Sequence, residues 1–489
     1  MNQAATLRNV TAHLRAVLIA ATVIATAVGV NADERPNFIF FITDDISPDD
    51  LPVYGNSCVQ APNLTRIAEN GLVFDNAVLT ISSCSPSRCS IITGRYPHNT
   101  GAPELHTSLP ASQQTFVQEL RKAGYYTVLS GKNHMGKPGD LGFDDASDGK
   151  PSGCEKWVNH LRDRPQDKPF FCWFASHDAH HPFTPTKDAP NYTAEEVTVP
   201  PMLFDGPGTR EELAAYYHEV SRTDHFAGEL MQELQRQGVA GRTYFIYCSD
   251  NGRPFPRCKT YLYDSGIRTP LIVSGPGVTA GRTQSLVSSI DFSATILDLA
   301  GVDKPSTVQG VSFRSVLKDP QAVVRDVAFS ERNWHVFQLH ERSVRFGEWL
   351  YIRNAWPDRH NVSGESAWYK FPAAKELWEA AAAGQLTNAQ ALLTQKPQRA
   401  EMLFNVRRDP YQFTDLAGLS EHADTLDRMR SLLNDWAAST GDTVPEHPTP
   451  DRGPLHEGGG NIQHGEFPGA AANAETINSP GPLRPAASP

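Results

Sequence analysis

The most reactive-looking stretch of the chain places a cysteine two residues before a proline and four residues before an arginine. Cys84, Pro86 and Arg88 lie in the run CSPSRCS, which leads into IITG at residues 91–94. Proline suits the first turn of a helix, so Cys84 is predicted at a helix N-terminus, where backbone N–H groups and the helix dipole favour an anion. Arg88 could bind oxyanions through paired hydrogen bonds. From these residues alone, Cys84 is either an activated cysteine or a buried structural thiol.

Four further polar groups each follow a short apolar run. The runs cover residues 38–42, 125–129, 169–175 and 244–248, and they are continuously apolar, as in buried strands of a parallel sheet. Ligands of open α/β sheets bind outside the carboxyl ends of the strands, so the four coincidences predict one shared site. In chain order, the groups that follow the runs are Asp44-Asp45, Lys132-Asn133-His134, His177-Asp178-Ala179-His180-His181 and Asp250-Asn251.

Two of these groups, Asp44-Asp45 and Asp250-Asn251, offer only oxygen ligands. Two carboxylates about 4 Å apart repel by about 4 kcal/mol at an effective dielectric of 20, so three together need a cation or bound protons. An all-oxygen set suits calcium or magnesium, whereas zinc usually recruits His or Cys. Each pair alone is an ordinary turn or cap sequence. Together, at the ends of predicted strands, they favour a metal site.

The elements around these strands predict two domains. Helical patterns supply the crossovers of a parallel sheet, so we expect a large α/β domain at residues 33–325. The later chain alternates around Gly347-Glu348 like an antiparallel hairpin, so we expect a smaller C-terminal α+β domain with an antiparallel sheet at residues 326–440. The predicted helices are 63–70, 115–123, 210–237 and 423–438; the hairpin is 343–354 and a further strand is 403–406.

Both ends of the chain differ from this globular pattern. Residues 1–32 combine two arginines, an uncharged run and the small-residue pattern VNA, which predicts a signal peptide and a periplasmic or secreted protein. The apolar run is too short and too rich in Ala and Thr to favour a membrane anchor, so no stable membrane association is expected. Residues 441–489 are rich in Pro, Gly, Ala, Ser and Asn and predict a disordered tail.

Composition excludes one class of partner. The net charge of −11 and the pI near 5.9 argue against nucleic acid, which needs a basic footprint. The seven cysteines are an odd number, so at least one lies outside any intramolecular pairing. Cys172 and Cys248 lie inside apolar runs and are predicted to be core thiols.

The ordered set of motifs resembles the type I sulfatase family. CSPSR, followed by IITGR, matches its C-x-P-x-R signature with the trailing T-G-R, and GKNHMG at residues 131–136 matches its G-K-x-H-x-G segment. Asp44-Asp45 and Asp250-Asn251 look like its two metal pairs, and the resemblance covers most of residues 36–325. It implies an alkaline phosphatase-like fold, with a large, mixed, mostly parallel sheet flanked by helices. In that family a maturation enzyme oxidises the cysteine to formylglycine, whose hydrated aldehyde is the nucleophile.

The resemblance also implies roles for single residues. Calcium, or magnesium, would be bound by Asp44, Asp45, Asp250, Asn251 and the modified residue 84. Arg88, Lys132 and Lys259 would neutralise the sulfate oxygens, Asp250 would accept a proton from the nucleophile, and His134 would remove the remaining diol proton. His180 would protonate the leaving oxygen, because HDAH resembles the family's H-x-P-H; His177 and His181 compete for this role, and Ala179 replaces the proline.

Several features are closer to the sulfamidase-like branch of the family. The segment RPFPRCK at residues 253–259, followed by YLY, resembles that branch, as does Leu105-His106. His106 is therefore a candidate substrate contact, with an exposed loop histidine as the alternative. Further candidates for the sugar pocket lie early in the smaller domain: Glu331, His335, His340 and Arg342.

Together, the residues and the resemblance predict an exported sulfatase that removes sulfate from a sulfated saccharide. A sulfamidase acting on N-linked sulfate of glucosamine is the alternative within the same chemistry. A glycan-binding protein whose Cys84 stays unmodified is an alternative of another class. A phosphatase or phosphodiesterase of the same superfamily would more naturally have Ser or Thr as nucleophile and additional His and Asp ligands for a zinc pair.

Overall fold

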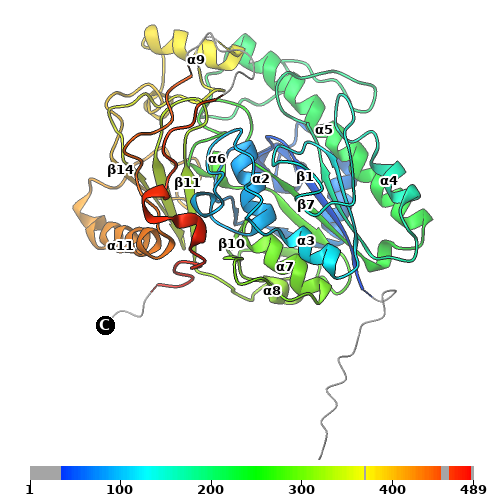
Figure 1. Ribbon diagram of the computed structural model, residues 1–489. Helices are drawn as coiled ribbons and strands as arrows, with labels where there is room; N and C mark the ends of the chain where they lie inside the picture. Colours follow the sequence, from blue (N-terminus) through cyan, green and yellow to red (C-terminus); the bar gives the residue numbers. More distant parts are fainter. Residues whose placement is uncertain (1–34, 368–369, 453–461, 486–489) are drawn as a thin grey trace, which may run out of the picture.

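The computed structural model describes residues 35–367, 370–452 and 462–485, so the predicted signal peptide lies outside the described residues. An eight-stranded sheet forms the centre of the larger part, in the order β5-β4-β6-β1-β7-β8-β2-β9 (Figure 1). Strand β1 (Asn37–Thr43) pairs in parallel with β6 (Phe170–Ala175) and β7 (Thr243–Ser249). Strand β8 (Leu271–Ser274) runs antiparallel to both of its neighbours. The predicted mixed, mostly parallel sheet is therefore confirmed.

Helices cover both faces of this sheet, which explains the continuously apolar strands. Phe38, Phe40 and Ile42 of β1 pack in the core formed with α2, α3, α7 and α8, whereas Ile39 and Phe41 pack in the core formed with α1, α4 and α5 (Figure 1). All residues of β1 are buried. A strand that is buried on both faces cannot alternate between apolar and polar residues.

A second, four-stranded antiparallel sheet has the order β11-β12-β13-β14. The predicted hairpin is confirmed: β12 (Glu341–Phe346) and β13 (Trp349–Asn354) pair around Gly347, whose φ of +56° lies in the left-handed region that glycine adopts readily. Helix α11 (Ala423–Thr440) packs on this sheet through a buried cluster that includes Trp436.

The remaining elements connect and flank the two larger sheets, and β3 and β10 pair in a separate two-stranded sheet. In the described part of the chain, the further strands are β2 (Gly71–Phe74), β3 (Ala77–Val78), β4 (Tyr126–Gly131), β5 (Asp145–Ser147), β9 (Gly281–Thr283), β10 (Val287–Ser288), β11 (Val327–Arg332) and β14 (Glu401–Asn405). The further helices are α1 (Pro62–Glu69), α2 (Cys84–Thr93), α3 (Phe116–Lys122), α4 (Trp157–Asp163), α5 (Pro207–Arg236), α6 (Asp264–Ile267), α7 (Asp291–Ala300), α8 (Arg314–Lys318), α9 (Pro372–Ala382) and α10 (Asn388–Ala391).

The prediction of a disordered tail over residues 441–489 is wrong for residues 441–452 and 462–485, which run back across the molecule (Figure 1). The buried guanidinium of Arg95 donates hydrogen bonds to the carbonyl oxygens of Glu475 and Ile477, both at 2.9 Å. Arg342 pairs with Asp442 at 2.7 Å. The segment looked disordered because it has few apolar residues, but buried polar groups of the folded domains hold it instead. Residues 453–461 and 486–489 lie outside the described part.

All seven cysteines are free thiols, and Cys172 and Cys248 lie in the core as predicted. None of the helices that the structure describes combines the length and the apolar character needed to cross a bilayer.

Candidate active site

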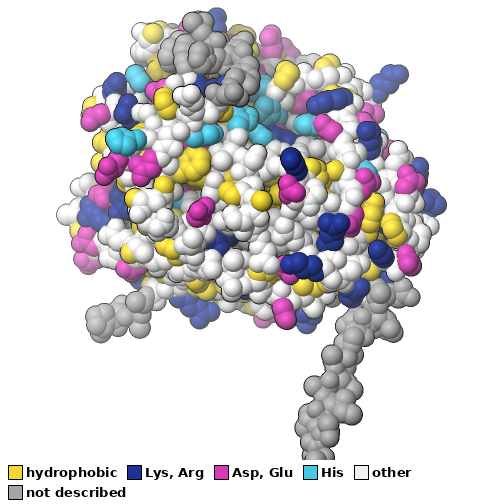
Figure 2. All heavy atoms as spheres, viewed as in Figure 1, with side chains coloured by type: hydrophobic (Ala, Val, Ile, Leu, Met, Phe, Trp, Pro, Cys, Tyr) yellow, Lys and Arg dark blue, Asp and Glu magenta, His cyan; other side chains and the backbone are white. Residues whose placement is uncertain are grey.

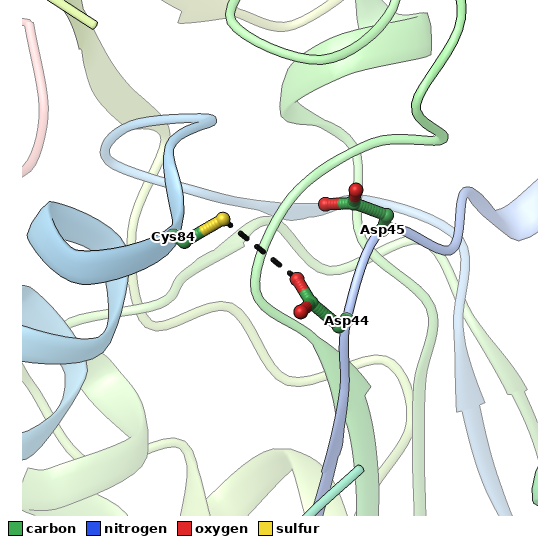
Figure 3. Close-up of side chains that lie close together, drawn as sticks. All are labelled: Asp44, Asp45 and Cys84. Atoms are coloured by element: carbon green, nitrogen blue, oxygen red, sulfur yellow. Dashed lines mark hydrogen bonds between the residues drawn. The ribbon is translucent and has the colours of Figure 1, made fainter. Parts of the chain in front are cut away.

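Cys84 begins helix α2 and faces the end of strand β1. Its Sγ lies 3.8 Å from Oδ1 of Asp44, and one ligand atom each of Asp44, Asp45 and Cys84 lies within 4.8 Å of the others (Figure 3). Cys84 is only 2% exposed. The predicted position at a helix start is confirmed, and it places residue 84 directly against two carboxylates.

The parallel pairing of β1 and β7 brings the two acidic pairs together. Thr43 and Ser249 are partners in the register, so the residues that follow them leave the sheet side by side. The side-chain amide of Asn251 donates a hydrogen bond to the Asp45 carboxylate, and the backbone N–H of Asp45 lies 3.4 Å from Oδ1 of Asp250.

The oxygen atoms of this cluster fit a hard divalent cation. Oδ1 of Asn251 is buried and has no hydrogen-bond partner in the part of the chain that the structure describes, although it lies in a group of buried carboxylates. A buried oxygen without a donor is costly unless a ligand binds it. Calcium or magnesium prefers this set of carboxylate and amide oxygens.

Three cations pair with the three carboxylates; the side chains of Arg88 and Lys259 are buried, and that of Lys132 is 12% exposed. Lys132 bonds to Asp44, Nζ of Lys259 lies 2.8 Å from Oδ2 of Asp45, and Nε of Arg88 lies 2.7 Å from Oδ2 of Asp250. These are the three cations that the sequence resemblance assigned to a sulfate group. This end of the sheet therefore brings three cations and three carboxylates close together, and each cation pairs with one carboxylate.

Burial and these cations shift the pKa values of the carboxyl groups in different directions. Burial disfavours the charged form of Asp44, but Lys132 and His180 outweigh it, so the pKa of Asp44 lies well below its ordinary value. Burial raises the pKa of Asp45 well above its ordinary value despite the nearby Lys259. The cluster therefore resists carrying three negative charges without a further cation.

The thiol form of residue 84 is a poor nucleophile at neutral pH. Burial raises the pKa of Cys84 to about 12, against the opposing effect of Lys132 and Lys259. Because the thiolate is the reactive form, an unmodified Cys84 stays protonated and inert near pH 7.

His134 and His180 lie beside the cluster and are neutral at pH 7. Burial lowers the pKa of His134 to about 2, with further contributions from Lys132 and His106. Burial, followed by Lys259, also holds the pKa of His180 well below its ordinary value. Nδ1 of His180 donates to the carbonyl oxygen of His181, so its Nε2 carries the free lone pair.

The structure separates the three histidines that competed for one role. His177 turns to Asp148, with 2.8 Å between Nε2 and Oδ1, and lies outside the lining of the cavity that holds Cys84. His181 lies 2.9 Å from Glu212 and stacks on the ring of Phe371. The third histidine, His180, has a pKa that is affected by the charges of Asp44, Lys132 and Lys259.

A cavity of about 920 Å³ opens at this cluster, and Cys84, Asp45, Lys259 and His180 line part of it. In the space-filling view, histidine side chains gather on this face of the molecule (Figure 2). Both predicted substrate contacts, His106 and His335, line the cavity as well. His106 approaches His134, with 2.7 Å between Nδ1 and Nε2.

Three other residues expected in the sugar pocket lie elsewhere. Glu331 is fully buried and bonds to Nδ1 of His98 at 2.7 Å. Arg342 pairs with Asp442 of the C-terminal segment, and His340 is buried in the same region beside Arg342. Arg342 thereby holds the C-terminal segment on the second sheet. None of the three lines the cavity, so the expectation that they form the sugar pocket is wrong.

Sequence reasoning missed Glu365, Phe371 and Arg452, all of which line the cavity. Arg452 reaches it because its backbone N–H bonds to the carbonyl oxygen of Val336, an anchor of the C-terminal segment. No motif marks these residues, and only the packing of distant segments places them at the site.

Comparisons with known proteins agree with this geometry. A family profile described as Sulfatase matches residues 36–152 and 154–302. An ulvan-active sulfatase of Formosa agariphila is 26% identical over 476 residues, which cover 86% of this chain and 78% of the relative. Human N-sulphoglucosamine sulphohydrolase is 28% identical over 481 residues, which cover 86% of this chain and 95% of the relative.

Solved structures share the fold. A protein solved in complex with its substrate D-glucosamine-2-N,6-O-disulfate superposes with a TM-score of 0.65 at 21% identity, over 83% of this chain and 98% of that chain. The architecture is alkaline phosphatase-like, with the antiparallel sheet added after the mixed sheet. With its family match spanning most of the larger sheet and Cys84 seated against Asp44 and Asp45, the chain belongs to the sulfatase family and is a type I sulfatase.

Proposed function

We propose that this sulfatase removes a sulfate group from a saccharide, using a formylglycine formed from Cys84 and a bound calcium ion. The observation that carries the proposal is the contact of Cys84 with Asp44 and Asp45 at a cavity large enough for a sugar. The names of the relatives support a sugar substrate, because one is active on ulvan and another acts on N-sulphoglucosamine. A maturation enzyme that oxidises Cys84 and export to the periplasm or beyond are part of the proposal.

The chain's own cations would bind the sulfate group. Formylglycine, as the hydrated aldehyde, supplies a hydroxyl nucleophile, and calcium supplies the positive charge that makes this hydroxyl more acidic. Calcium would be held by Asp44, Asp45, Asp250, Asn251 and residue 84, with magnesium as the other ion that suits these oxygens. Lys132, Lys259 and Arg88, which now pair with the carboxylates, would then be available to the sulfate oxygens, because a bound cation would compensate the carboxylate charge. One such preorganised donor typically contributes about 3 kcal/mol to transition-state binding.

Two histidines and one carboxylate would move the protons. Asp250, which lies beside the end of β1 in the acidic cluster, would accept the proton of the attacking hydroxyl. His180, once protonated at Nε2 beside the bound sulfate, would donate that proton to the leaving oxygen, since Nδ1 is occupied by the carbonyl of His181. A bound sulfate adds negative charge beside His180 and thereby counteracts the burial that lowers its pKa. His134, neutral and close to Lys132, removes the proton that releases sulfate and restores the aldehyde.

A sulfamidase is the second candidate within this chemistry. The alignment with human N-sulphoglucosamine sulphohydrolase, which spans 95% of that relative, favours it. The two activities differ in the leaving atom, oxygen or nitrogen, and in how readily that atom accepts a proton from His180.

The test is sulfate release from a panel of sulfated mono- and oligosaccharides that includes O-sulfated and N-sulfated glucosamine. The protein is produced with a formylglycine-generating enzyme, and the peptide that contains residue 84 is weighed by mass spectrometry. We expect the lighter aldehyde at residue 84 and sulfate release that a chelator abolishes and calcium restores. An unmodified cysteine in protein from its native host, with saccharide binding but no turnover, would instead establish a glycan-binding protein.

A further inference from the structure

The carboxylate of Glu365 has unused hydrogen-bonding capacity inside the catalytic cavity. Its side chain is 9% exposed and lines the cavity that contains Cys84. Oε1 lies 3.5 Å from Nζ of Lys259 and 3.8 Å from Nε2 of His335, both longer than an ordinary hydrogen bond. Oε2 is buried and has no hydrogen-bond partner among the described residues.

Glu365 is ionised despite its burial. Burial by itself would raise its pKa, but Lys259, His335 and Lys370 together lower the pKa of Glu365 to about 2. Its own backbone N–H also stabilises the charge. Buried ionised carboxylates are normally saturated with donors, since an unmatched one is costly. A ligand with hydrogen-bond donors could supply, inside the cavity, the hydrogen bonds that this carboxylate lacks.

Two short connections link Glu365 to the reaction centre. Lys259 lies between Glu365 and Asp45, with distances of 3.5 Å and 2.8 Å from its Nζ. His335 lies between Glu365 and Ser83, whose hydroxyl is 2.8 Å from Nδ1 of the imidazole and which directly precedes Cys84. A sulfate that reaches Lys259 therefore brings the atoms attached to it next to Glu365.

We propose that Glu365 is a specificity-determining residue that accepts hydrogen bonds from hydroxyl or ammonium groups of the sugar ring beside the sulfate-bearing position. The inference rests on the proposed function, that the substrate is a sulfated saccharide. A carboxylate can accept two donors at once and strengthens each bond with its charge. It equally repels a second sulfate or a carboxylate at the same place on the sugar, so it selects against such substrates.

Glu365 could instead act only through Lys259, by fixing where this cation points. The two roles predict different results with a substrate that has no sugar. An aryl sulfate such as 4-nitrophenyl sulfate needs Lys259 but offers no hydroxyl or ammonium donor to Glu365. A residue that only positions Lys259 affects both substrates alike, whereas a residue that binds the sugar affects the saccharide alone.

The test compares Glu365→Ala and Glu365→Gln with the wild type on two substrates. These are 4-nitrophenyl sulfate and the saccharide of the panel above with the highest kcat/KM. We expect kcat/KM for the saccharide to fall about 10- to 100-fold in Glu365→Ala, mainly through KM, the effect of one or two charge-assisted hydrogen bonds. Activity on 4-nitrophenyl sulfate should stay within about twofold. Glu379→Gln, which removes an exposed carboxylate on α9, is the matched control and should change neither.

The Gln variant distinguishes the two kinds of donor. An amide oxygen still accepts from a hydroxyl, so Glu365→Gln should retain part of the activity if the partner is a hydroxyl. With an ammonium partner the charge matters most, and Glu365→Gln should be nearly as impaired as Glu365→Ala. N-acetylation of the sugar amine should then remove the difference between wild type and variant.

Equal losses on both substrates, or no loss on the saccharide, would overturn the proposal. Calorimetric binding of the panel sugars to Cys84→Ala protein, with and without Glu365→Ala, decides the question independently of turnover. Weaker sugar binding in the double variant supports the proposal, and equal binding refutes it. A wild-type protein that releases no sulfate from any substrate would refute the proposed function. The binding measurement would still test whether Glu365 binds the sugar.

Discussion

Replacement of Lys259 by methionine should reveal whether Asp45 belongs to a cation site. Lys259 is 1% exposed, and its Nζ lies 2.8 Å from Oδ2 of the fully buried Asp45. Methionine keeps the length and apolar stem of the side chain but removes the charge. Removal of one partner of a buried pair typically destabilises a protein by about 3–5 kcal/mol, because the other charge stays buried without compensation.

The same variant should be rescued in part by calcium. In the wild type, calcium has to displace Lys259 from Asp45, whereas in Lys259→Met the carboxylate is free to bind it. A ligand at about 100 times its Kd stabilises the folded state by about 2.7 kcal/mol, and we expect a larger gain for the variant than for the wild type. The difference in unfolding free energy between the two proteins should therefore shrink when calcium replaces EDTA.

The measurement is urea unfolding of both proteins in EDTA and in excess calcium. Lys122→Met, which removes a largely exposed lysine paired with Glu119, is the control and should change stability by less than about 1 kcal/mol in either buffer. Even in calcium, Lys259→Met should lose about 100- to 1000-fold in kcat/KM on a sulfate ester, because a sulfate-binding cation is gone. If the difference in unfolding free energy between wild type and Lys259→Met is the same in EDTA and in calcium, Asp45 does not belong to a cation site.

Three further outcomes follow from the structure. Cys84→Ala should abolish sulfate release while the circular dichroism spectrum and the unfolding midpoint stay close to wild type; unchanged turnover would show that residue 84 is not the nucleophile. Arg95→Ala leaves carbonyl oxygens of the C-terminal segment without their donor. We therefore expect the free energy of unfolding in urea to fall by about 3–5 kcal/mol and proteolysis after residue 440 to become faster. A variant that resists proteolysis as well as the wild type would contradict the anchoring role. Burial lowers the pKa of His335 to about 3, so the folded state binds fewer protons than the unfolded state below pH 6.5, and stability should fall as the pH drops from 7 to 5. Below pH 6.5 the slope from this residue approaches about 1.4 kcal/mol per pH unit, and His335→Asn should flatten the profile; a variant with the wild-type slope would disprove the assignment.

The strands that carry the catalytic groups could be predicted from the sequence because their physical signal is local. The continuous apolar run at residues 38–42 favours burial on both faces, and the structure places β1 inside the sheet with alternate residues in two separate cores. The polar pairs that follow β1 and β7 must then lie close together, since parallel neighbouring strands end at the same edge of the sheet. Cys84 at the start of α2 was equally local, because it depends on Pro86 and the first helical turn.

The C-terminal segment was misread for an equally physical reason. Its composition offers little apolar surface, which is the usual mark of disorder. Its order comes from partners far away in the chain: Arg95 and Arg342 hold Glu475, Ile477 and Asp442 through buried hydrogen bonds and an ion pair. No local pattern encodes such bonds.

The sequence by itself therefore determined the catalytic edge of the sheet: the strands, the acidic pairs beyond them and the cysteine at a helix start, all of which depend on neighbours within a few residues. Only the tertiary structure decided the walls of the cavity. It moved Glu331 and Arg342 away from the pocket, turned His177 toward Asp148, and brought Glu365 beside Lys259. The physical reason is that these contacts join segments separated by tens to hundreds of residues, and their energies come from burial and charge pairing that exist only after the chain has packed.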